Sequence, residues 1–232
     1  MGVISVGLQD CRERIDRACR LAGRRPESVG LLAVSKTYPA AAVREAYGAG
    51  QRRFGESYLQ EALAKQTELI DLELEWHFIG PIQGNKTRPI AGHFAWAHGV
   101  DRLKIAQRLA EVRPANLPPL NVCIQVNVSG EVSKHGVAPD EALALARAVA
   151  CLPRLKLRGF MCIAQATGDP AEQRRQFARL RALLEQAAGL GLDTLSMGMS
   201  SDLEAAIMEG ATIVRVGTAI FGQRQYDKET TS

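Results

Sequence analysis

The sequence predicts an α/β protein: a single (β/α)8 barrel of the TIM type, preceded by an extra N-terminal helix. Short apolar runs alternate with helical patterns along the chain, and eight such runs can be counted. The 232 residues, 46% of them hydrophobic, match the size of a one-domain barrel, so we expect one domain over residues 1–232. No G-x-G-x-x-G turn follows the first strand, which argues against a doubly wound open sheet.

The chain begins with an amphipathic helical pattern. Apolar residues recur at helical spacing over 8–22, charged residues fill the other face, and Gly23 ends the pattern. The continuous apolar run 29–34 then predicts the first strand, and the polar residues 35–37 break it. We therefore expect one helix to precede the barrel.

Strands and helices alternate through the middle of the chain. Pro39 suits the first turn of a helix, Ser57 and Gln60 have capping-box spacing, and Asp101 suits an N-cap. In order, we predict helix 39–49, strand 52–55, helix 58–69, strand 76–80, helix 85–91, strand 94–99 and helix 101–112.

The remaining elements continue the alternation after a proline-rich link. Pro139 opens one helix, Asp169 and Pro170 open what we predict to be the longest, and Ser201 with Glu204 again has capping-box spacing. In order, we predict strand 120–128, helix 139–151, strand 155–163, helix 169–188, strand 194–199, a helix from 201 and strand 212–216.

Composition excludes several classes of function. The net charge is only +4 and aromatic residues make up 5%, so we expect no nucleic-acid partner. No apolar stretch approaches the roughly 18 residues of a membrane span. The five cysteines show no C-x-x-C spacing, which indicates a reducing, cytosolic setting. The four histidines lack metal-ligand spacing, so we expect no metal site. The sequence shows no added interface element, so we expect a monomer.

Polar residues follow the seventh and eighth predicted strands, where barrels often hold phosphate. Ser200 and Ser201 come after strand seven, and Gly217 and Thr218 come after strand eight. Hydroxyls and unpaired backbone amides there suit a phosphate. Alone, Ser201 could be only a helix cap and Gly217 only a turn residue. Their occurrence together favours a phosphate site.

Two cationic residues lie at the same end of the predicted barrel. Lys36 follows the first strand; it is either a solvated surface lysine or an amine that forms a Schiff base with an aldehyde-bearing phosphate cofactor. Arg215 lies within an apolar strand, where a guanidinium needs a partner: a structural carboxylate or the ring nitrogen of that cofactor. Because arginine keeps its proton, such a ring would stabilise carbanions poorly, which argues against decarboxylation and transamination.

With these residues in place, the sequence closely resembles the pyridoxal phosphate (PLP) homeostasis protein family, whose fold matches the barrel domain of alanine racemase. The matching segments are LLAVSKTYPA (31–40), FGESYLQEA (54–62), WHFIGPIQGNKTR (76–88), QVNVSGEVSKHGV (125–137), RGFMCIAQA (158–166), SMGMSSDLEAAI (196–207) and VRVGTAIFGQRQY (214–226). The resemblance implies that Lys36 carries pyridoxal 5'-phosphate as a Schiff base and that Arg215 faces its ring nitrogen. It places the phosphate on Ser200, Ser201, Gly217 and Thr218.

The resemblance also implies a role. Members hold PLP and hand it over, so apo PLP-dependent enzymes are the expected recipients, with little or no turnover. Family members usually carry asparagine where this chain has Ser57, and serine where it has Gly84. The sequence ends soon after the last motif, and we expect the second, β-rich domain of alanine racemase to be absent. A small PLP-dependent amino-acid racemase and a lysine-dependent aldolase for sugar phosphates are the alternatives.

Overall fold

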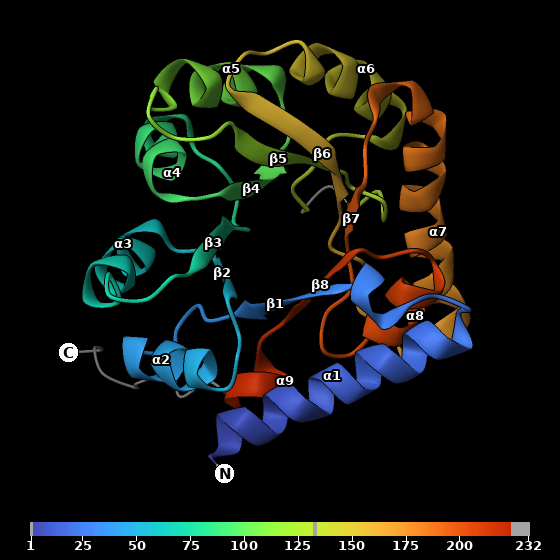
Figure 1. Cartoon of the computed structure of the whole chain (residues 1–232). Coiled ribbons are helices and arrows are strands. Elements are labelled where there is room, and N and C mark those ends of the chain that lie inside the picture. The colour runs from blue at the N-terminus through green and yellow to red at the C-terminus, as the bar shows by residue number, and fades with distance from the viewer. Residues whose placement is uncertain (1, 132–133, 224–232) are drawn as a thin grey trace, which may run out of the picture.

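Eight parallel strands form a closed barrel in which each strand neighbours the next along the chain and β8 pairs with β1 (Figure 1). The computed structural model describes residues 2–131 and 134–223. The strands are β1 Gly30–Val34, β2 Arg53–Glu56, β3 Glu75–Phe78, β4 Trp96–Val100, β5 Leu120–Gln125, β6 Leu155–Met161, β7 Thr194–Ser196 and β8 Ile213–Val216. The predicted fold class is confirmed.

Helices surround the barrel and connect its strands (Figure 1). They are α1 Val3–Leu21, α2 Ala40–Gly48, α3 Leu59–Glu68, α4 Thr87–His93, α5 Leu103–Val112, α6 Pro139–Ala150, α7 Pro170–Gln186, α8 Leu203–Met208 and α9 Thr218–Phe221. Short 3-10 turns lie at Pro26–Ser28, Gly84–Lys86 and Ala188–Leu190. In Figure 1, α1 runs beneath the barrel alongside α8 and α9. It is the extra N-terminal helix that the sequence predicts.

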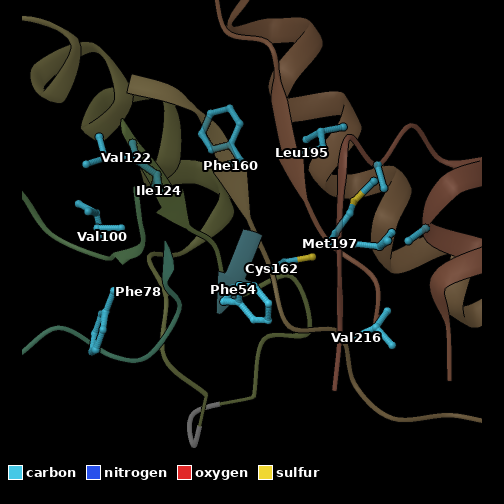
Figure 2. Packing of buried hydrophobic residues seen from close by; sticks show 14 of the residues in the cluster. Phe54, Phe78, Val100, Val122, Ile124, Phe160, Cys162, Leu195, Met197 and Val216 are labelled. Atoms are coloured by element: carbon cyan, nitrogen blue, oxygen red, sulfur yellow. The ribbon is translucent and has the colours of Figure 1, made fainter. Parts of the chain in front are cut away.

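Buried side chains form two layers, because successive residues of a strand point to opposite faces. The larger layer lies between the strands and the helices, and Figure 2 shows Phe54, Ile124 and Phe160 within it. The smaller cluster lies on the other face of the strands and includes Leu32, Trp96, Cys123, Met161 and Ile213. Side chains therefore fill the barrel interior, as in other parallel barrels of this size.

Three predicted N-caps are wrong. α3, α5 and α8 follow Tyr58, Arg102 and Asp202, and none of these residues makes a side-chain capping hydrogen bond. The three residues that were predicted as caps lie in other environments. Asp101 pairs with Arg102, Ser57 lines a cavity, and Ser201 lies in a turn two residues before α8 begins. The Asp169 cap of α7 is confirmed by a 2.9 Å bond from the Ala171 amide.

Other differences concern the lengths of elements. Strand β5 ends at Gln125 and β7 at Ser196, earlier than predicted, because the chain turns there into the loops above the barrel. The longest helix in the described residues is α1, with 19 residues against 17 in α7. The four-residue α9 was not predicted, because one turn is too short to show a periodic pattern.

Within residues 2–131 and 134–223, no helix combines the length and the apolar character needed to cross a bilayer. The same ranges contain no group of three His, Cys, Asp or Glu side chains arranged to hold a metal ion.

Candidate functional site

A cavity of about 950 Å³ opens at the carboxyl ends of the strands. All six residues that the sequence singled out line it: Lys36, Ser200, Ser201, Arg215, Gly217 and Thr218. The opposite wall comes from the segments after β2 and β3, including Ser57, Tyr58, Gln83 and Lys86. The closed barrel thus brings residues from both ends of the sequence to one site, because β8 pairs with β1.

Lys36 follows β1, and its preceding residue is held firmly. Ser35 is buried, and its amide donates to the Gly55 carbonyl at 3.1 Å. Its hydroxyl donates to Glu56 Oε1 at 2.7 Å, and its carbonyl accepts from Lys65 Nζ at 2.6 Å. The backbone that presents Lys36 is therefore fixed by three bonds at the residue before it.

The residue after Lys36 is also fixed. Thr37 adopts φ +70°, a left-handed conformation that is uncommon for a threonine. Its amide donates to Glu61 Oε1 at 2.6 Å, and the same oxygen accepts from Lys65 Nζ at 2.5 Å. A conformation of this kind persists only where surrounding contacts hold it. Glu61 and Lys65, both in α3, supply those contacts.

Glu56 is the buried acid of this support. It pairs with Lys65 at 2.8 Å, and burial raises the pKa of Glu56, while the neighbouring ammonium of Lys65 opposes that shift. Its Oε2 is buried and has no hydrogen-bond partner among the described residues. Sequence reasoning missed Glu56 and Lys65, because a Glu–Lys pair nine residues apart shows no helical or strand spacing.

Four backbone amides form a cradle beside Lys36. Those of Ser200, Ser201, Gly217 and Thr218 donate to no acceptor in the part of the chain that the structure describes. All four residues line the cavity. Unpaired N–H groups of residues that line a cavity suit an anion with several acceptor oxygens. The space beside Gly217 is tight, since an added Cβ would lie 3.1 Å from the Val34 carbonyl oxygen.

Arg215 is buried between this cradle and the barrel interior, with 5% of its surface exposed. Its Nη1 donates to Ser196 Oγ at 2.9 Å and its Nη2 to the Cys162 carbonyl at 2.8 Å. No carboxylate among the described residues forms an ion pair with it, and burial lowers its pKa. Two of its five N–H groups are used, so donors remain for a ligand in the cavity.

A chain of buried polar groups continues from Arg215 through the barrel. Ser196 Oγ lies 2.8 Å from His98 Nδ1, and His98 Nε2 lies 2.9 Å from His77 Nδ1. His77 Nε2 in turn lies 2.8 Å from a carboxylate oxygen of Glu75. Burial lowers the pKa of His77, and lowers that of His98 well below its usual value, so both rings are neutral near pH 7.

The proton positions in this chain follow from its acidic end. The Glu75 carboxylate only accepts, because its hydrogen bond from His77 lowers its pKa. His77 therefore donates from Nε2 and accepts at Nδ1, which requires His98 to donate from Nε2 and accept at Nδ1. The Ser196 hydroxyl then donates to His98 and accepts from Arg215. Sequence reasoning missed this chain, since it treated the histidines only as possible metal ligands.

The comparisons with known proteins agree with this geometry. The family model for the N-terminal domain of alanine racemase matches residues 6–225. The chain belongs to the alanine racemase N-terminal domain family. This family member is 66% identical over 226 residues to the pyridoxal phosphate homeostasis protein of Pseudomonas aeruginosa, covering 97% of this chain and 98% of that protein. It is 52% identical over 237 residues to the protein of the same name in Escherichia coli K12, covering 99% and 100%.

Solved structures have the same barrel fold as this chain. PipY of Synechococcus elongatus without PLP has a TM-score of 0.80 and 44% identity, covering 90% of this chain and 99% of that chain. PipY with PLP bound has a TM-score of 0.78 and 43% identity, covering 90% and 100%. Alanine racemase of Corynebacterium glutamicum, 18% identical with a TM-score of 0.66, shares the fold; this chain covers 62% of it. The resemblance to PLP homeostasis proteins is confirmed.

The two positions where the sequence departs from the usual family pattern lie near the cavity. Ser57 lines it, so its shorter side chain is exposed to whatever occupies the site. At Gly84, an added Cβ would meet only the end of the flexible Arg108 side chain. The family segments 125–137 and 214–226 extend beyond the described residues at 132–133 and 224–226.

Proposed function

We propose that this protein binds pyridoxal 5'-phosphate as a Schiff base on Lys36 and serves in PLP and amino-acid homeostasis. The observation that carries the proposal is the amine of Lys36 in one cavity with four unpaired backbone amides. The names of the Pseudomonas and Escherichia relatives, and the PLP-bound PipY structure, support the choice of cofactor.

The residues present fit both ends of PLP. The phosphate oxygens would accept from the amides of Ser200, Ser201, Gly217 and Thr218, with hydroxyls from three of these residues as further donors. Lys36 would hold the aldehyde carbon as a Schiff base, with loss of one water. When bound, PLP supplies an electron-withdrawing ring conjugated to that carbon.

Arg215 is the residue that we expect to contact the ring nitrogen of PLP. It is a buried cation without an ion-pair partner among the described residues, and it retains unused N–H donors on the cavity side. A pyridine nitrogen, which accepts one hydrogen bond, would pair with one of these donors. Since a guanidinium donates without giving up its proton, the ring nitrogen would stay unprotonated and withdraw electrons weakly.

This electronic setting favours holding PLP over transforming amino acids with it. We infer that turnover is low and that apo PLP-dependent enzymes are the recipients of the cofactor. We also infer that the protein works in the cytosol as a monomer. Holding the reactive aldehyde on Lys36 would keep the concentration of free PLP low. A role in homeostasis requires this.

The test of the site is reductive trapping. The purified protein loaded with PLP should be yellow, and borohydride should bleach it and leave a stable adduct on Lys36, located by mass spectrometry of peptides. The variant Lys36→Ala should lose the imine absorbance while staying folded. The variant Lys86→Ala, which removes another lysine from the same cavity, is the matched control and should keep the colour.

Two results would contradict the proposal. One is an unchanged visible spectrum in Lys36→Ala, and the other is an adduct found only on a different lysine. A protein that stays colourless in excess PLP but binds sugar phosphates through Lys36 would instead favour the aldolase alternative.

A further inference from the structure

The extra helix α1 contacts the turn that carries two of the cradle residues. Arg14, in α1, donates from Nη2 to the carbonyl oxygen of Ser200 at 2.9 Å. Its Nε and Nη2 also donate to the two carboxylate oxygens of Glu204 at 2.7 and 2.9 Å. This two-point contact with a carboxylate fixes the plane of the guanidinium. The donor that reaches Ser200 is therefore held in one orientation.

The bond to the Ser200 carbonyl orients a whole peptide unit. A trans peptide is planar, with its C=O and N–H on opposite sides, and no cis peptide occurs in the described residues. Because Arg14 holds the Ser200 carbonyl toward α1, the N–H of Ser201 points away from α1. Ser201 lines the cavity, and its amide donates to no acceptor in the described ranges. Arg14 thus directs an unpaired donor away from the helix and toward the cavity side.

Helix α1 also lies against the other half of the cradle. Gly7 is buried where an added Cβ would lie 2.6 Å from the Ala219 carbonyl oxygen and 2.8 Å from that of Ile220. These residues directly follow Thr218. One helix therefore supports both the turn after β7 and the turn after β8, although it contributes no residue to the cavity lining.

We propose that Arg14 is a positioning residue for phosphate recognition: it holds the Ser200–Ser201 peptide so that the Ser201 amide donates to the phosphate of bound PLP. This rests on the proposed function, since it assumes that the cavity holds PLP. Arg14 acts through the backbone and touches no ligand. Its loss should weaken binding of a phosphate-bearing ligand and leave binding of the same ring without phosphate unchanged.

The test compares PLP with pyridoxal, which carries the same aldehyde and ring but no phosphate. Dissociation constants for both are measured by absorbance titration in the parent, Arg14→Ala, Arg14→Lys and Arg20→Ala. Arg20 lies on the same helix, is exposed and makes no side-chain hydrogen bond or ion pair among the described residues, so Arg20→Ala is the matched control. Thermal unfolding of each protein without ligand checks the fold.

We expect Arg14→Ala to raise the Kd for PLP by about threefold to tenfold, the effect of one hydrogen bond, with the Kd for pyridoxal unchanged. Arg14→Lys keeps a charged donor but cannot make the two-point contact with Glu204, so its Kd for PLP should lie between those of the parent and Arg14→Ala. Glu204→Gln leaves Arg14 in place and weakens only its two-point contact with residue 204. This variant should weaken PLP binding less than Arg14→Ala does and leave pyridoxal binding unchanged. It tests the role of Arg14 even if Arg14→Ala does not fold.

Equal weakening of PLP and pyridoxal would mean that Arg14 only supports the fold, and it would overturn the inference. Unchanged PLP binding in both Arg14 variants would overturn it as well. A parent protein that forms no imine with either aldehyde is a separate result. It would remove the proposed function itself, regardless of Arg14.

Discussion

The backbone on both sides of Lys36 is held by residues from other elements of the barrel. The flanking residues Ser35 and Thr37 are held by Glu56, Glu61 and Lys65, which come from β2 and α3. A second lysine, Lys65, lies behind this backbone, and its ammonium donates to two carboxylates and to the Ser35 carbonyl. Lys36 lines the cavity and Lys65 does not, which makes Lys36 the candidate nucleophile.

The neutral histidine chain leads to a prediction about pH. The folded-state pKa values of His77 and His98 are lowered, so the unfolded chain binds protons below about pH 6.5 that the folded chain does not. Their contribution to stability is complete above that pH and is lost as the pH falls. Each histidine should cost up to about 1.4 kcal/mol per pH unit in this window. Urea unfolding at pH 7, 6 and 5 measures it.

A variant isolates this effect from other titrating groups. Burial raises the pKa of Glu56 and Asp202, which acts in the opposite direction, so the comparison must be between proteins. His98→Gln should give a shallower loss of stability with falling pH than the parent. The exposed His93, changed to Gln, is the control and should keep the parent's slope. Parallel profiles in parent and His98→Gln would refute the assignment.

At the scale of elements, β6 depends on a close approach that only glycine allows. Gly159 pairs with Thr194 of β7, and an added Cβ would lie 1.9 Å from the Thr194 carbonyl oxygen at a φ of +155°. The register between β5 and β6 also shifts just before Gly159. Gly159→Ala should therefore lower the free energy of unfolding by about 2–4 kcal/mol, measured by chemical denaturation.

Gly92 provides the matched substitution. It lies in α4, and an added Cβ would meet nothing within 4 Å. Gly92→Ala should leave stability unchanged or raise it by up to about 1 kcal/mol, because alanine favours the helix. Equal stabilities for Gly159→Ala and the parent would show that the β6–β7 pairing can move aside.

At the scale of the whole molecule, the proposed carrier function predicts slow amino-acid chemistry. Amino-acid racemisation on PLP needs acid–base groups on both faces of the ring. Lys36 offers one face, and Tyr58, which is 55% exposed, is the tyrosine among the described residues that lines the same cavity. If Arg215 faces the ring nitrogen as proposed, the loaded protein should exchange the Cα proton of L-alanine in deuterated water far more slowly than an enzyme.

Proton NMR of L-alanine with the loaded protein measures that exchange directly. Exchange at the rate of a working enzyme would contradict the carrier function and favour the racemase alternative. In that case Tyr58→Phe decides whether the tyrosine is the second acid–base group, since only its hydroxyl is removed.

Local pattern was enough to predict the barrel and the positions of its key polar residues. Alternation of short apolar runs with helical spacing is a property of neighbouring residues, so it can be read without knowing the fold. Because the carboxyl ends of parallel strands share one edge, Lys36, Ser200 and Gly217 could be placed together before the structure was known.

Contacts between distant residues were decided by the tertiary structure alone. Arg14 meets the Ser200 carbonyl across 186 positions, and His98 meets Ser196 across 98, because barrel closure sets these distances. The predicted caps Ser57, Asp101 and Ser201 failed for a related reason: where a helix begins depends on which partners compete for its first residues. The sequence by itself determined the barrel and the residues that line its cavity, and tertiary packing decided what holds those residues in place.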